Sequence, residues 1–362
     1  MNRMKVGVLG ATGMVGQNYL RLLDNHPWFE VTYVAASPRS AGKPFSQAVA
    51  GRWLMPQPIP GAVEDLTVGD ANDVAQAAGC ELVFSAIEAD KDTIRRLEEA
   101  YAAAGIPVVS NNSAHRSTPD VPMMVPEVNW DHAELIKDQR QQRGWTRGLI
   151  AVKPNCSVQS YVTPVHALQQ AGYPVSTMIV TTLQAVSGAG FPGPASYTMI
   201  DGVVPYIGGE EEKSEREPQR ILGQVSEGKV IPDTSIAIAA HCNRVAVIDG
   251  HMACVSLKFA QRIPSLDEVR QIWQDFTSEP QRLELPSAPI PAMIYREEPD
   301  RPQPRLDRDA GCGMAVTLGR LRPCPVFDIR FVGLSHNTVR GAAGGAILTA
   351  ELLKAKGYIG DE

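Results

Sequence analysis

The stretch Lys5-Val6-Gly7-Val8-Leu9-Gly10-Ala11-Thr12-Gly13-Met14-Val15-Gly16 decides the fold of the N-terminal part of this chain. Its apolar start predicts a strand, its glycines predict a sharp turn, and the apolar positions after them predict a helix. Glycines at this spacing let the chain turn tightly, let the backbone approach a pyrophosphate and let the helix pack closely on the strand, while the helix N-terminus faces the anion. We therefore expect a dinucleotide site that includes Gly10, Thr12, Gly13, Met14 and Val15.

A second strand is expected at residues 31–36, and the residues after it bear on the choice of cofactor. A site for NAD usually places Asp or Glu at the end of this strand to bind the ribose 2′-hydroxyl. Here Ser37, Arg39 and Ser40 stand in that region, and hydroxyls together with a cation suit a 2′-phosphate. NADP is the expected cofactor, and the alternative is a solvated turn whose charges are incidental.

Residues 81–87 and 106–110 predict two further strands, and 89–104 predict a helix between them. Repeated alternation of strand and helix is typical of a doubly wound parallel sheet. Ligands bind such sheets at the carboxyl ends of the strands, so Ser85 joins the expected cofactor residues. The later strand leads into a polar run in which Arg116 suits a carboxylate or a phosphate, with a plain surface loop as the alternative.

Cys156 stands where another strand meets another helix. Residues 149–152 predict the strand, Pro154 ends it, Asn155 can cap the helix, and apolar residues recur at helical spacing over 158–168. The first turn of a helix favours the thiolate, which is the nucleophilic form of cysteine. Cys156 is therefore the candidate nucleophile, and an inert buried cysteine is the alternative.

Three β-rich segments after Cys156, at 178–186, 253–259 and 327–332, predict a second and mostly antiparallel sheet, which is a natural subunit interface. The expected fold class is α/β, with an N-terminal Rossmann-type doubly wound parallel sheet and an α+β domain for catalysis and dimerisation. The first domain is placed at 1–152 and is completed by a C-terminal helix within 337–362, and the second domain is placed at 153–336.

Two segments of the second domain carry further candidate groups. The glycine-rich loop 187–193 could approach a ligand with bare backbone, although a connector would look similar. In 208–213, Glu210 and Lys213 share a helix face. Their opposite charges would suit a substrate with both an amine and an anion, and solvated charge is the usual alternative.

His251 is the candidate acid and base for Cys156. It comes after an apolar run that begins beyond Arg244, and an imidazole can take a thiol proton and later return one. A structural histidine is the alternative. The other histidines remain rivals, namely His26, His115, His132, His166, His241 and His336.

Composition limits the class of protein. The chain has 362 residues, of which 44% are hydrophobic and 20% charged, as in ordinary folded proteins of two domains. A net charge of -6 without a dense Lys/Arg block argues against nucleic-acid binding. Scattered cysteines and the lack of a long apolar run predict a cytoplasmic protein with no metal and no membrane partner. The Pro-, Arg- and Asp-rich segment 285–309 predicts a surface excursion of unread function.

Taken in order, several motifs resemble aspartate-β-semialdehyde dehydrogenase, in its archaeal and fungal branch, over nearly the whole chain. The motifs are 10–16, 37–42, 120–129, 154–157, Gln184 with 187–190, 208–213, 243–245 with 249–251, and 337–341. The resemblance implies an NADP-dependent, phosphorylating aldehyde dehydrogenase that reduces L-aspartyl 4-phosphate to aspartate 4-semialdehyde. That reaction belongs to the aspartate pathway to lysine and diaminopimelate, threonine, methionine and isoleucine. A homodimer or homotetramer is implied as well.

The resemblance also implies roles for single residues. Cys156 is the nucleophile and His251 the acid and base. The implied substrate ligands are Arg244 for the α-carboxylate, Glu210 for the amino group, Arg116 and Lys213 for the phosphate, and Gln184 for orientation. Asn337 contacts the nicotinamide side, and Ser187 and Gly188 complete the expected cofactor residues. Residues 111–115 depart from the family pattern.

Two other functions fit the same motifs. A malonyl-CoA reductase type of acyl-CoA reductase would use the same thiol and NADPH, although Glu210 and Lys213 lean towards an amino acid phosphate. A non-catalytic NADP-binding sensor would be expected to lack the nucleophile or the base, and the chain has both. Dimer or tetramer, the strictness of NADP over NAD, and allosteric regulation stay open.

Overall fold

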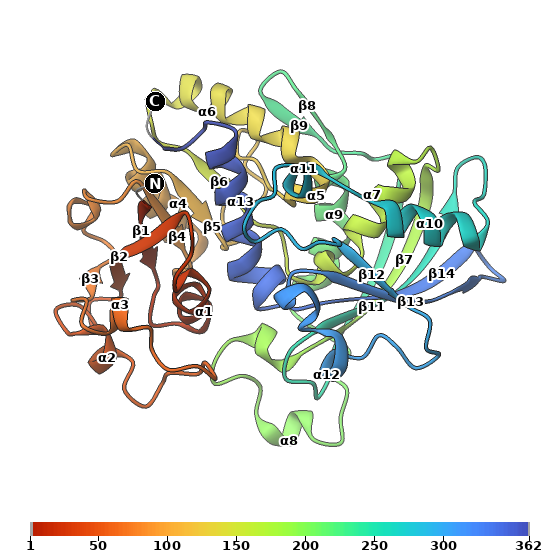
Figure 1. Cartoon of the computed structure of the whole chain (residues 1–362), viewed down its shortest axis with the longest axis horizontal. Helices are drawn as coiled ribbons and strands as arrows, with labels where there is room; N and C mark the ends of the chain where they lie inside the picture. The colour runs from red at the N-terminus through yellow and green to blue at the C-terminus, as the bar shows by residue number, and fades with distance from the viewer. Residues whose placement is uncertain (1–2, 361–362) are drawn as a thin grey trace.

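The glycine turn after Leu9 lies at the centre of the first of two large sheets (Figure 1). A computed structural model describes residues 3–360. Within this range the first sheet has six parallel strands in the order β3-β2-β1-β4-β5-β6. Their bounds are β1 Met4–Leu9, β2 Phe29–Ala36, β3 Gly69–Asp70, β4 Leu82–Ser85, β5 Val108–Ser110 and β6 Ile150–Val152. The chain changes direction across the sheet between β1 and β4, which is where doubly wound sheets bind ligands.

Gly10 has no room for a side chain at this switch point. Its φ is +77°, and a Cβ there would lie 2.3 Å from the carbonyl oxygen of Ala86, just after β4. A Cβ on Gly16 would lie 2.2 Å from the carbonyl oxygen of Gly10, because helix α1 (Met14–Leu23) packs directly on the turn. The predicted unit of strand, glycine turn and helix is confirmed.

The second sheet is mixed. Within residues 3–360 its six strands lie in the order β10-β7-β11-β14-β13-β12. Their bounds are β7 Val175–Gln184, β10 Ala237–Arg244, β11 His251–Phe259, β12 Met293–Arg296, β13 Val316–Pro323 and β14 Ile329–Ser335. The three central pairings are antiparallel and the pairings at both edges are parallel, so the prediction of a mostly antiparallel sheet is confirmed.

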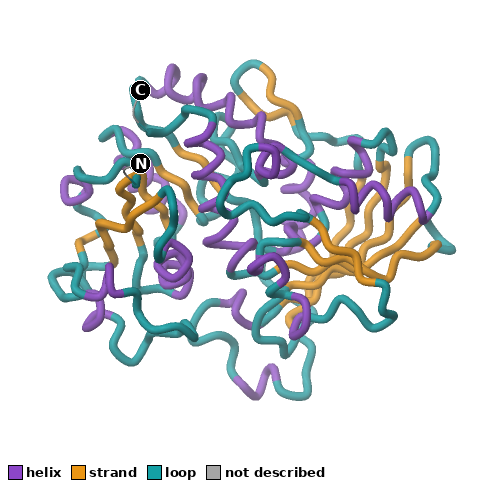
Figure 2. Tube along the Cα trace, viewed as in Figure 1, coloured by secondary structure: helices purple, strands orange, loops and turns teal. Residues whose placement is uncertain are grey.

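Helices α7 (Val162–Gln170) and α10 (Leu266–Asp275) cover one face of this sheet, and Figure 2 shows them in purple above the orange strands. Trp273 of α10 packs against Phe331 of β14 with 5.0 Å between ring centroids. Alternate residues of β11 point to the opposite face, where Cys254 is exposed. One face of the sheet therefore belongs to the core, and the other is open in the single chain.

Helix α13 (Gly344–Ala355) lies between the two sheets (Figure 1). Ile347 and Leu348 belong to the same hydrophobic cluster as Val6 and Val8 of β1, so the last helix shares a core with the first strand. The other helices are α2 Phe45–Ala48, α3 Gly61–Glu64, α4 Lys91–Ala103, α5 Pro126–Asn129, α6 Leu135–Arg143, α8 Ser196–Met199, α9 Glu210–Ile221, α11 Glu279–Arg282 and α12 Pro304–Asp307, and β8 Gln224–Ser226 pairs with β9 Lys229–Ile231.

The segment 285–309 is only partly the surface excursion that its composition predicted. It contains β12, which joins the second sheet, and the short helix α12. Asp307 is 1% exposed and accepts hydrogen bonds from Arg296 at 3.1 Å and Arg301 at 2.7 Å. The charged residues that suggested solvated loop satisfy one another, and this pairing lets the segment enter the fold.

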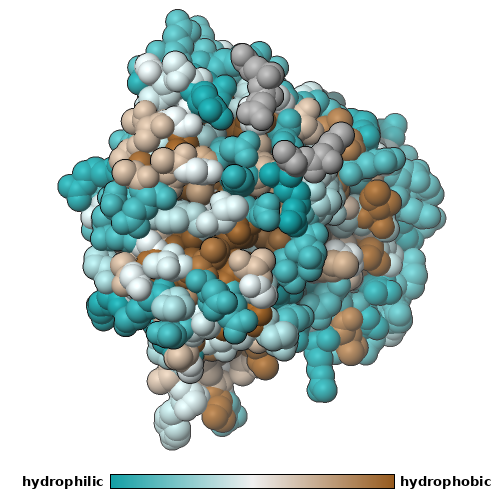
Figure 3. All heavy atoms as spheres, turned by 60° about the vertical axis from the view of Figure 1, so that its left-hand side comes forward, coloured by the Kyte–Doolittle hydropathy of each residue, from teal (hydrophilic) through white to brown (hydrophobic). Residues whose placement is uncertain are grey.

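An excursion between β7 and α9 carries α8 and forms the lobe at the bottom of Figures 1 and 3. The exposed apolar side chains of this lobe are Phe191, Tyr197, Ile200, Val203 and Tyr206. Figure 3 also shows apolar surface gathered in a central hollow of the N-terminal side of the molecule. Among residues 3–360, none of the helices has the length and apolar character that crossing a bilayer requires.

Candidate active site

Cys156 lies at the start of a four-residue 3-10 helix, Ser157–Ser160, beyond the end of β6. The Oδ1 atom of Asn155 accepts hydrogen bonds from the backbone N–H of Ser157 at 2.8 Å and from its hydroxyl at 2.7 Å. Asn155 therefore caps this turn, as the sequence predicted. The expected continuous helix is broken at Tyr161, whose φ is -141°, and α7 begins only at Val162.

The thiol of Cys156 is less acidic than a helix N-terminus alone would make it. Burial raises the pKa of Cys156 above its ordinary value, and the nearby carboxylate of Glu210 raises it further, while Lys153, Arg116 and Arg244 lower it. The turn after Cys156 has only four residues and supplies little dipole, and burial together with Glu210 sets the direction of the pKa shift. Thiolate formation here depends on the surrounding cations.

His251 is the first residue of β11 and is fully buried. Its Nδ1 atom accepts the backbone N–H of Ala185 at 3.0 Å, so the proton of the neutral ring resides on Nε2. Burial, followed by the charge of Arg244, lowers the pKa of His251 to about 3. The ring is therefore neutral at physiological pH, and its Nε2–H, which has no partner among the described residues, is free to donate.

Packing brings the segments that carry Cys156 and His251 next to each other. The hydroxyl of Ser160, in the turn after Cys156, donates to the carbonyl oxygen of His251 at 2.8 Å. A Cβ on Gly188 would lie 3.1 Å from the Nε2 atom of His251, and a Cβ on Gly341 would lie 2.8 Å from the Cβ atom of Cys156. Both glycines thus let backbone close over the candidate nucleophile and acid.

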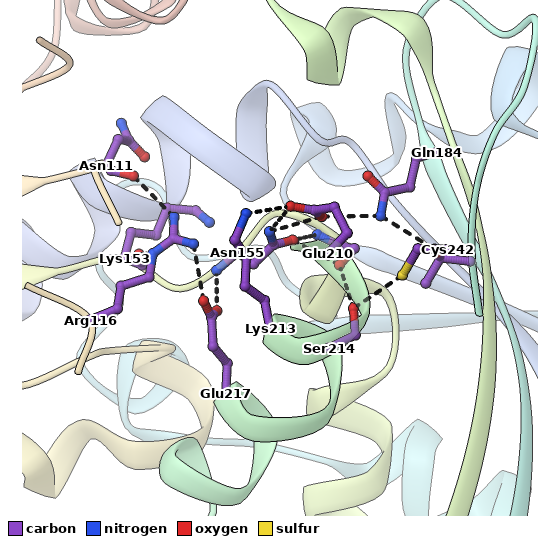
Figure 4. A network of polar contacts seen from close by, with 12 residues as sticks. Asn111, Arg116, Lys153, Asn155, Gln184, Glu210, Lys213, Ser214, Glu217 and Cys242 are labelled. Atoms are coloured by element: carbon purple, nitrogen blue, oxygen red, sulfur yellow. Dashed lines mark hydrogen bonds and ion pairs between the residues drawn. The ribbon is translucent and has the colours of Figure 1, made fainter. Parts of the chain in front are cut away.

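Helix α9 turns a charged face towards Asn155 (Figure 4). Glu210 accepts hydrogen bonds from the side chain of Asn155 at 2.9 Å, from Lys213 at 2.8 Å and from Gln184 at 3.2 Å. Although burial opposes it, the ammonium of Lys213 holds the pKa of Glu210 below its ordinary value. Glu210 is therefore an anion at neutral pH, with Lys213 as its ion-pair partner.

Gln184 and Arg244 are the last residues of the neighbouring parallel strands β7 and β10 and stand opposite each other in the register. Both are buried, at 1% and 7% exposure. The guanidinium of Arg244 donates to the carbonyl oxygen of Ala185 at 2.8 Å, and the N–H of Ala185 is the group that fixes the tautomer of His251. The ends of these strands thus point a cation and an amide towards the same site.

Sequence reasoning missed two ionisable residues of this site, Lys153 and Glu217. Lys153 is 2% exposed, its ammonium donates to the carbonyl oxygen of Pro154 at 2.8 Å, and burial lowers its pKa to about 7. Glu217 binds Arg116 at 3.1 Å and the backbone N–H of Asn155 at 2.5 Å. The spacing of seven residues between Glu210 and Glu217 was the signal for Glu217, because it places both on one helix face. No comparable signal marked Lys153.

A cavity of about 430 Å³ opens at the switch point of the first sheet. Six of the expected cofactor residues line it: Gly10, Thr12, Gly13, Met14, Ser37 and Arg39. The floor at Gly10 has no space for a Cβ, and the N-terminus of α1 faces the cavity, which fits a pyrophosphate. Arg52 and Glu88, which the sequence reasoning did not single out, also line the cavity.

The other expected cofactor residues lie outside the lining of this cavity. Val15 and Ser40 are adjacent to lining residues in the chain, and Ser85 is buried, where it accepts a hydrogen bond from Asn112 at 3.2 Å. On the His251 side, Asn337 donates to Ser187 at 2.8 Å and accepts the backbone N–H of Gly250 at 2.8 Å. The loop of Ser187 and Gly188 continues to Phe191, which does reach the cavity.

Comparisons with known proteins agree on one kind of molecule. Residues 5–136 match the model of the semialdehyde dehydrogenase NAD binding domain, and 165–340 match that of the semialdehyde dehydrogenase dimerisation domain. Aspartate-semialdehyde dehydrogenase of Schizosaccharomyces pombe is 46% identical over 98% of this chain and 99% of its own, and that of Methanothermobacter thermautotrophicus is 45% identical over 97% and 99%. The crystal structure of the Candida albicans aspartate semialdehyde dehydrogenase with NADP superimposes with a TM-score of 0.90, at 40% identity, over 99% of this chain and 100% of that one.

Proposed function

The chain belongs to the aspartate-semialdehyde dehydrogenase family, and from this premise we propose that it reduces L-aspartyl 4-phosphate to L-aspartate 4-semialdehyde with NADPH and releases phosphate. The reaction serves the aspartate pathway to lysine and diaminopimelate, threonine, methionine and isoleucine. The relatives favour neither an acyl-CoA reductase of the malonyl-CoA reductase type nor a non-catalytic NADP-binding sensor.

The observation that carries the proposal is the arrangement of opposite charges around one thiol. Glu210 and Lys213 pair with each other at 2.8 Å beside the Cys156 loop. A substrate with an ammonium and a phosphate would replace the ion pair between Glu210 and Lys213. Its ammonium would pair with Glu210, and its phosphate with Lys213 and Arg116. Arg244 remains for the α-carboxylate, and Gln184 orients the substrate between them.

In the first half of the reaction, the sulfur of Cys156 attacks the acyl carbon and the bond to the phosphate oxygen breaks. This leaves a thioacyl-enzyme and inorganic phosphate. Arg116 and Lys213 stabilise the departing charge, and we assign the oxyanion to the backbone N–H of Cys156, because those of Asn155 and Ser157 already bind Glu217 and Asn155. The cations that lower the pKa of Cys156 assist its loss of a proton, and that proton ends on the departing phosphate, which leaves as hydrogen phosphate.

In the second half, the thioester is reduced to a thiohemiacetal, which collapses to the aldehyde and frees the sulfur. When bound, NADPH supplies the hydride. His251 holds its proton on Nε2, as the contact with Ala185 dictates, and so it donates to the oxygen that becomes negative. For His251 to accept a proton at Nε2, the ring would have to adopt the other tautomer, with its proton on Nδ1 and the contact with the N–H of Ala185 lost.

The cofactor proposal is NADP in the cavity at the switch point, with the residues that line it as ligands and Asn337, Ser187 and Gly188 on the nicotinamide side. Arg39 and Ser37 are assigned to the 2′-phosphate, as cation and hydroxyl. Ser40, Ser85 and Val15 are proposed as supporting residues of the same site. A domain 1–152 completed by 337–362 would hold the cofactor, and 153–336 the substrate.

A dimerisation domain is present in the chain, and the face of the second sheet that carries Cys254 is the surface we propose for a homodimer. A tetramer would need a further contact. We place the protein in the cytoplasm, a proposal supported by the cysteines of the described chain, none of which is paired in a disulfide.

The proposal is tested by the rate of NADPH formation from aspartate semialdehyde and NADP. We expect the rate to depend on inorganic phosphate, because phosphate must displace the acyl group from Cys156 in this direction. A parallel assay follows NADPH oxidation with malonyl-CoA. Phosphate-independent turnover, or faster turnover of the CoA thioester, would overturn the proposal.

A further inference from the structure

One carboxylate of α9 holds two parts of the site that are far apart in the sequence. Glu217 is 8% exposed, and each of its oxygens has its own partner (Figure 4). Oε1 accepts the Nη1–H of Arg116 at 3.1 Å, and Oε2 accepts the backbone N–H of Asn155 at 2.5 Å. Arg116 comes after β5, whereas Asn155 precedes the nucleophile.

Arg116 is fixed on three sides. Besides Glu217, its Nε atom donates to the carbonyl oxygen of Lys153 at 3.0 Å and its Nη2 atom to that of Asn111 at 3.1 Å. A guanidinium has five N–H groups, so two of them remain for a ligand, one on each terminal nitrogen. The protein contacts thus decide which N–H groups of Arg116 an anion meets.

Asn155 is held just as fully. Its side-chain N–H groups bind Glu210 at 2.9 Å, its Oδ1 caps Ser157 at 2.8 Å, and its backbone N–H binds Glu217. Glu210 and Glu217, which lie seven residues apart on one helix face, therefore both accept hydrogen bonds from Asn155. The backbone N–H contact is charge-assisted and short, which is typical of the stronger hydrogen bonds.

We propose that Glu217 is a positioning residue that couples the phosphate subsite to the nucleophile, by holding Arg116 with one oxygen and the amide of Asn155 with the other. The proposal rests on the proposed function, in which Arg116 binds the phosphate. Glu217 does not touch the substrate and acts through its two partners.

The coupling has an electrostatic consequence. The carboxylate cancels part of the charge that Arg116 presents, so phosphate binds more weakly than it would to a free guanidinium. Weak binding suits the reductive direction, in which phosphate is a product that must leave. The two carbonyl contacts of Arg116 keep the guanidinium oriented even without Glu217, so loss of the charge outweighs loss of orientation.

Glu217→Gln separates the two duties of the residue. Glutamine has the same shape, but its amide nitrogen must face one of two donors, either Arg116 or the N–H of Asn155, so one contact is lost. We expect phosphate to bind about 5- to 10-fold more tightly, because the opposing charge is gone. We expect kcat to fall about 10-fold, because the loop of Cys156 is held less firmly.

The binding arm needs no turnover. The rate at which iodoacetamide alkylates Cys156 is measured at increasing concentrations of inorganic phosphate, by peptide-resolved mass spectrometry. The dependence of this rate on phosphate gives the Kd for phosphate in the wild type, Glu217→Gln and Glu212→Gln. Glu212 is exposed on the same helix and makes no hydrogen bond among the described residues, so its variant should match the wild type. The kinetic arm measures KM for phosphate and kcat in the oxidation of aspartate semialdehyde.

In Glu217→Gln we expect KM for phosphate to fall, because phosphate binds more tightly, and kcat to fall as well, because the loop of Cys156 is held less firmly. A purely structural glutamate would give weaker phosphate binding, and that outcome, or an unchanged Kd, overturns the proposal. Glu217→Asp serves if the glutamine variant does not fold, because it keeps the charge but cannot reach both partners; it should leave phosphate affinity within about 2-fold and still lower kcat. Absence of any turnover in the wild type would count against the proposed function alone, since the alkylation arm remains readable.

Discussion

Gly10, Thr12, Gly13 and Met14 reach the cofactor cavity from a single turn, whereas the groups around Cys156 come from segments as distant as Arg116 and Gly341. The cavity is also open, with about 430 Å³ of free space, while the side chains around the partly exposed Cys156 bond to one another. The first region presents backbone groups of the glycine turn to the cavity. In the second region, Glu210 is already paired with Lys213 and Glu217 with Arg116.

This difference shows how the two regions should respond to change. The glycine turn should keep its fold when a side chain that only contacts the ligand is removed. It should not accept an added Cβ at Gly10, where the backbone leaves no space. A site made of paired charges tolerates little, because removal of one partner leaves another buried and unsatisfied. Substitutions in one region should therefore leave the other intact, and that independence can be measured.

The largest effect is expected for Cys156→Ser. Serine keeps the size of the side chain but lacks a nucleophile that ionises near neutrality, so kcat should fall by at least about 1,000-fold. NADP binding, measured by fluorescence titration, should stay within about 2-fold because the cavity does not include residue 156. Retained turnover would remove Cys156 from its role, and lost NADP binding would show that the two regions are not independent.

Gly10→Ala should break the cofactor region in the same selective way. The added Cβ would lie 2.3 Å from the carbonyl oxygen of Ala86, at a φ of +77°, so NADP affinity should fall by about 100-fold or more and stability by about 2–4 kcal/mol. Gly42→Ala is the matched control, since its φ is +81° but nothing lies within 4 Å; it should cost about 1 kcal/mol. Calorimetry measures both effects, and equal losses in the two variants would refute the steric argument.

Acid should weaken the thiol region through His251. Because burial holds its pKa at about 3 in the folded chain, against about 6.5 when unfolded, the unfolded state binds more protons between these values. The contribution to stability is full above pH 6.5 and is lost as the pH falls towards 3. We expect the wild type to lose about 2 kcal/mol more than His251→Gln between pH 7 and pH 4.5, measured by urea unfolding; parallel curves would contradict this.

The smallest effect is expected at the rim of the cofactor cavity. Arg39 is exposed and lines the cavity, so Arg39→Ala should raise KM for NADP about 10-fold and leave KM for NAD within about 2-fold. The ratio of the two constants is the measurement, and NAD is its internal control. A parallel loss for both cofactors would mean that Arg39 does not bind the 2′-phosphate.

The strand, glycine turn and helix of the cofactor half could be predicted because their signals are local. The glycine turn, the alternation of strand and helix and the six lining residues all come from short-range rules. The sequence also predicted which parts of the second half carry charge, since Glu210 and Lys213 share one turn of α9. The second sheet was expected from its β-rich segments. Both parallel edges were missed, because neither β10 nor β12, which lies in a charged segment, was predicted as a strand.

Pairings across the chain could not be predicted in this way. Glu217 acts on Arg116, one hundred and one positions away, and no local pattern joins them. The raised pKa of Cys156 could not be predicted for the same reason, because helix position is visible in the sequence but burial of the thiol is not. The tautomer of His251 depends on one backbone N–H at Ala185, which only the folded β7 and β11 bring together.

The closure of Gly341 over Cys156 has a consequence for the time at which the protein becomes an enzyme. The ribosome synthesises Cys156, Glu210 and His251 well before the residues of α13, which shares a hydrophobic core with β1. The thiol of Cys156 is therefore exposed in the nascent chain. A product truncated shortly after Ser335 should have no activity, rather than low activity. Catalytic competence therefore requires α13 to be synthesised and docked.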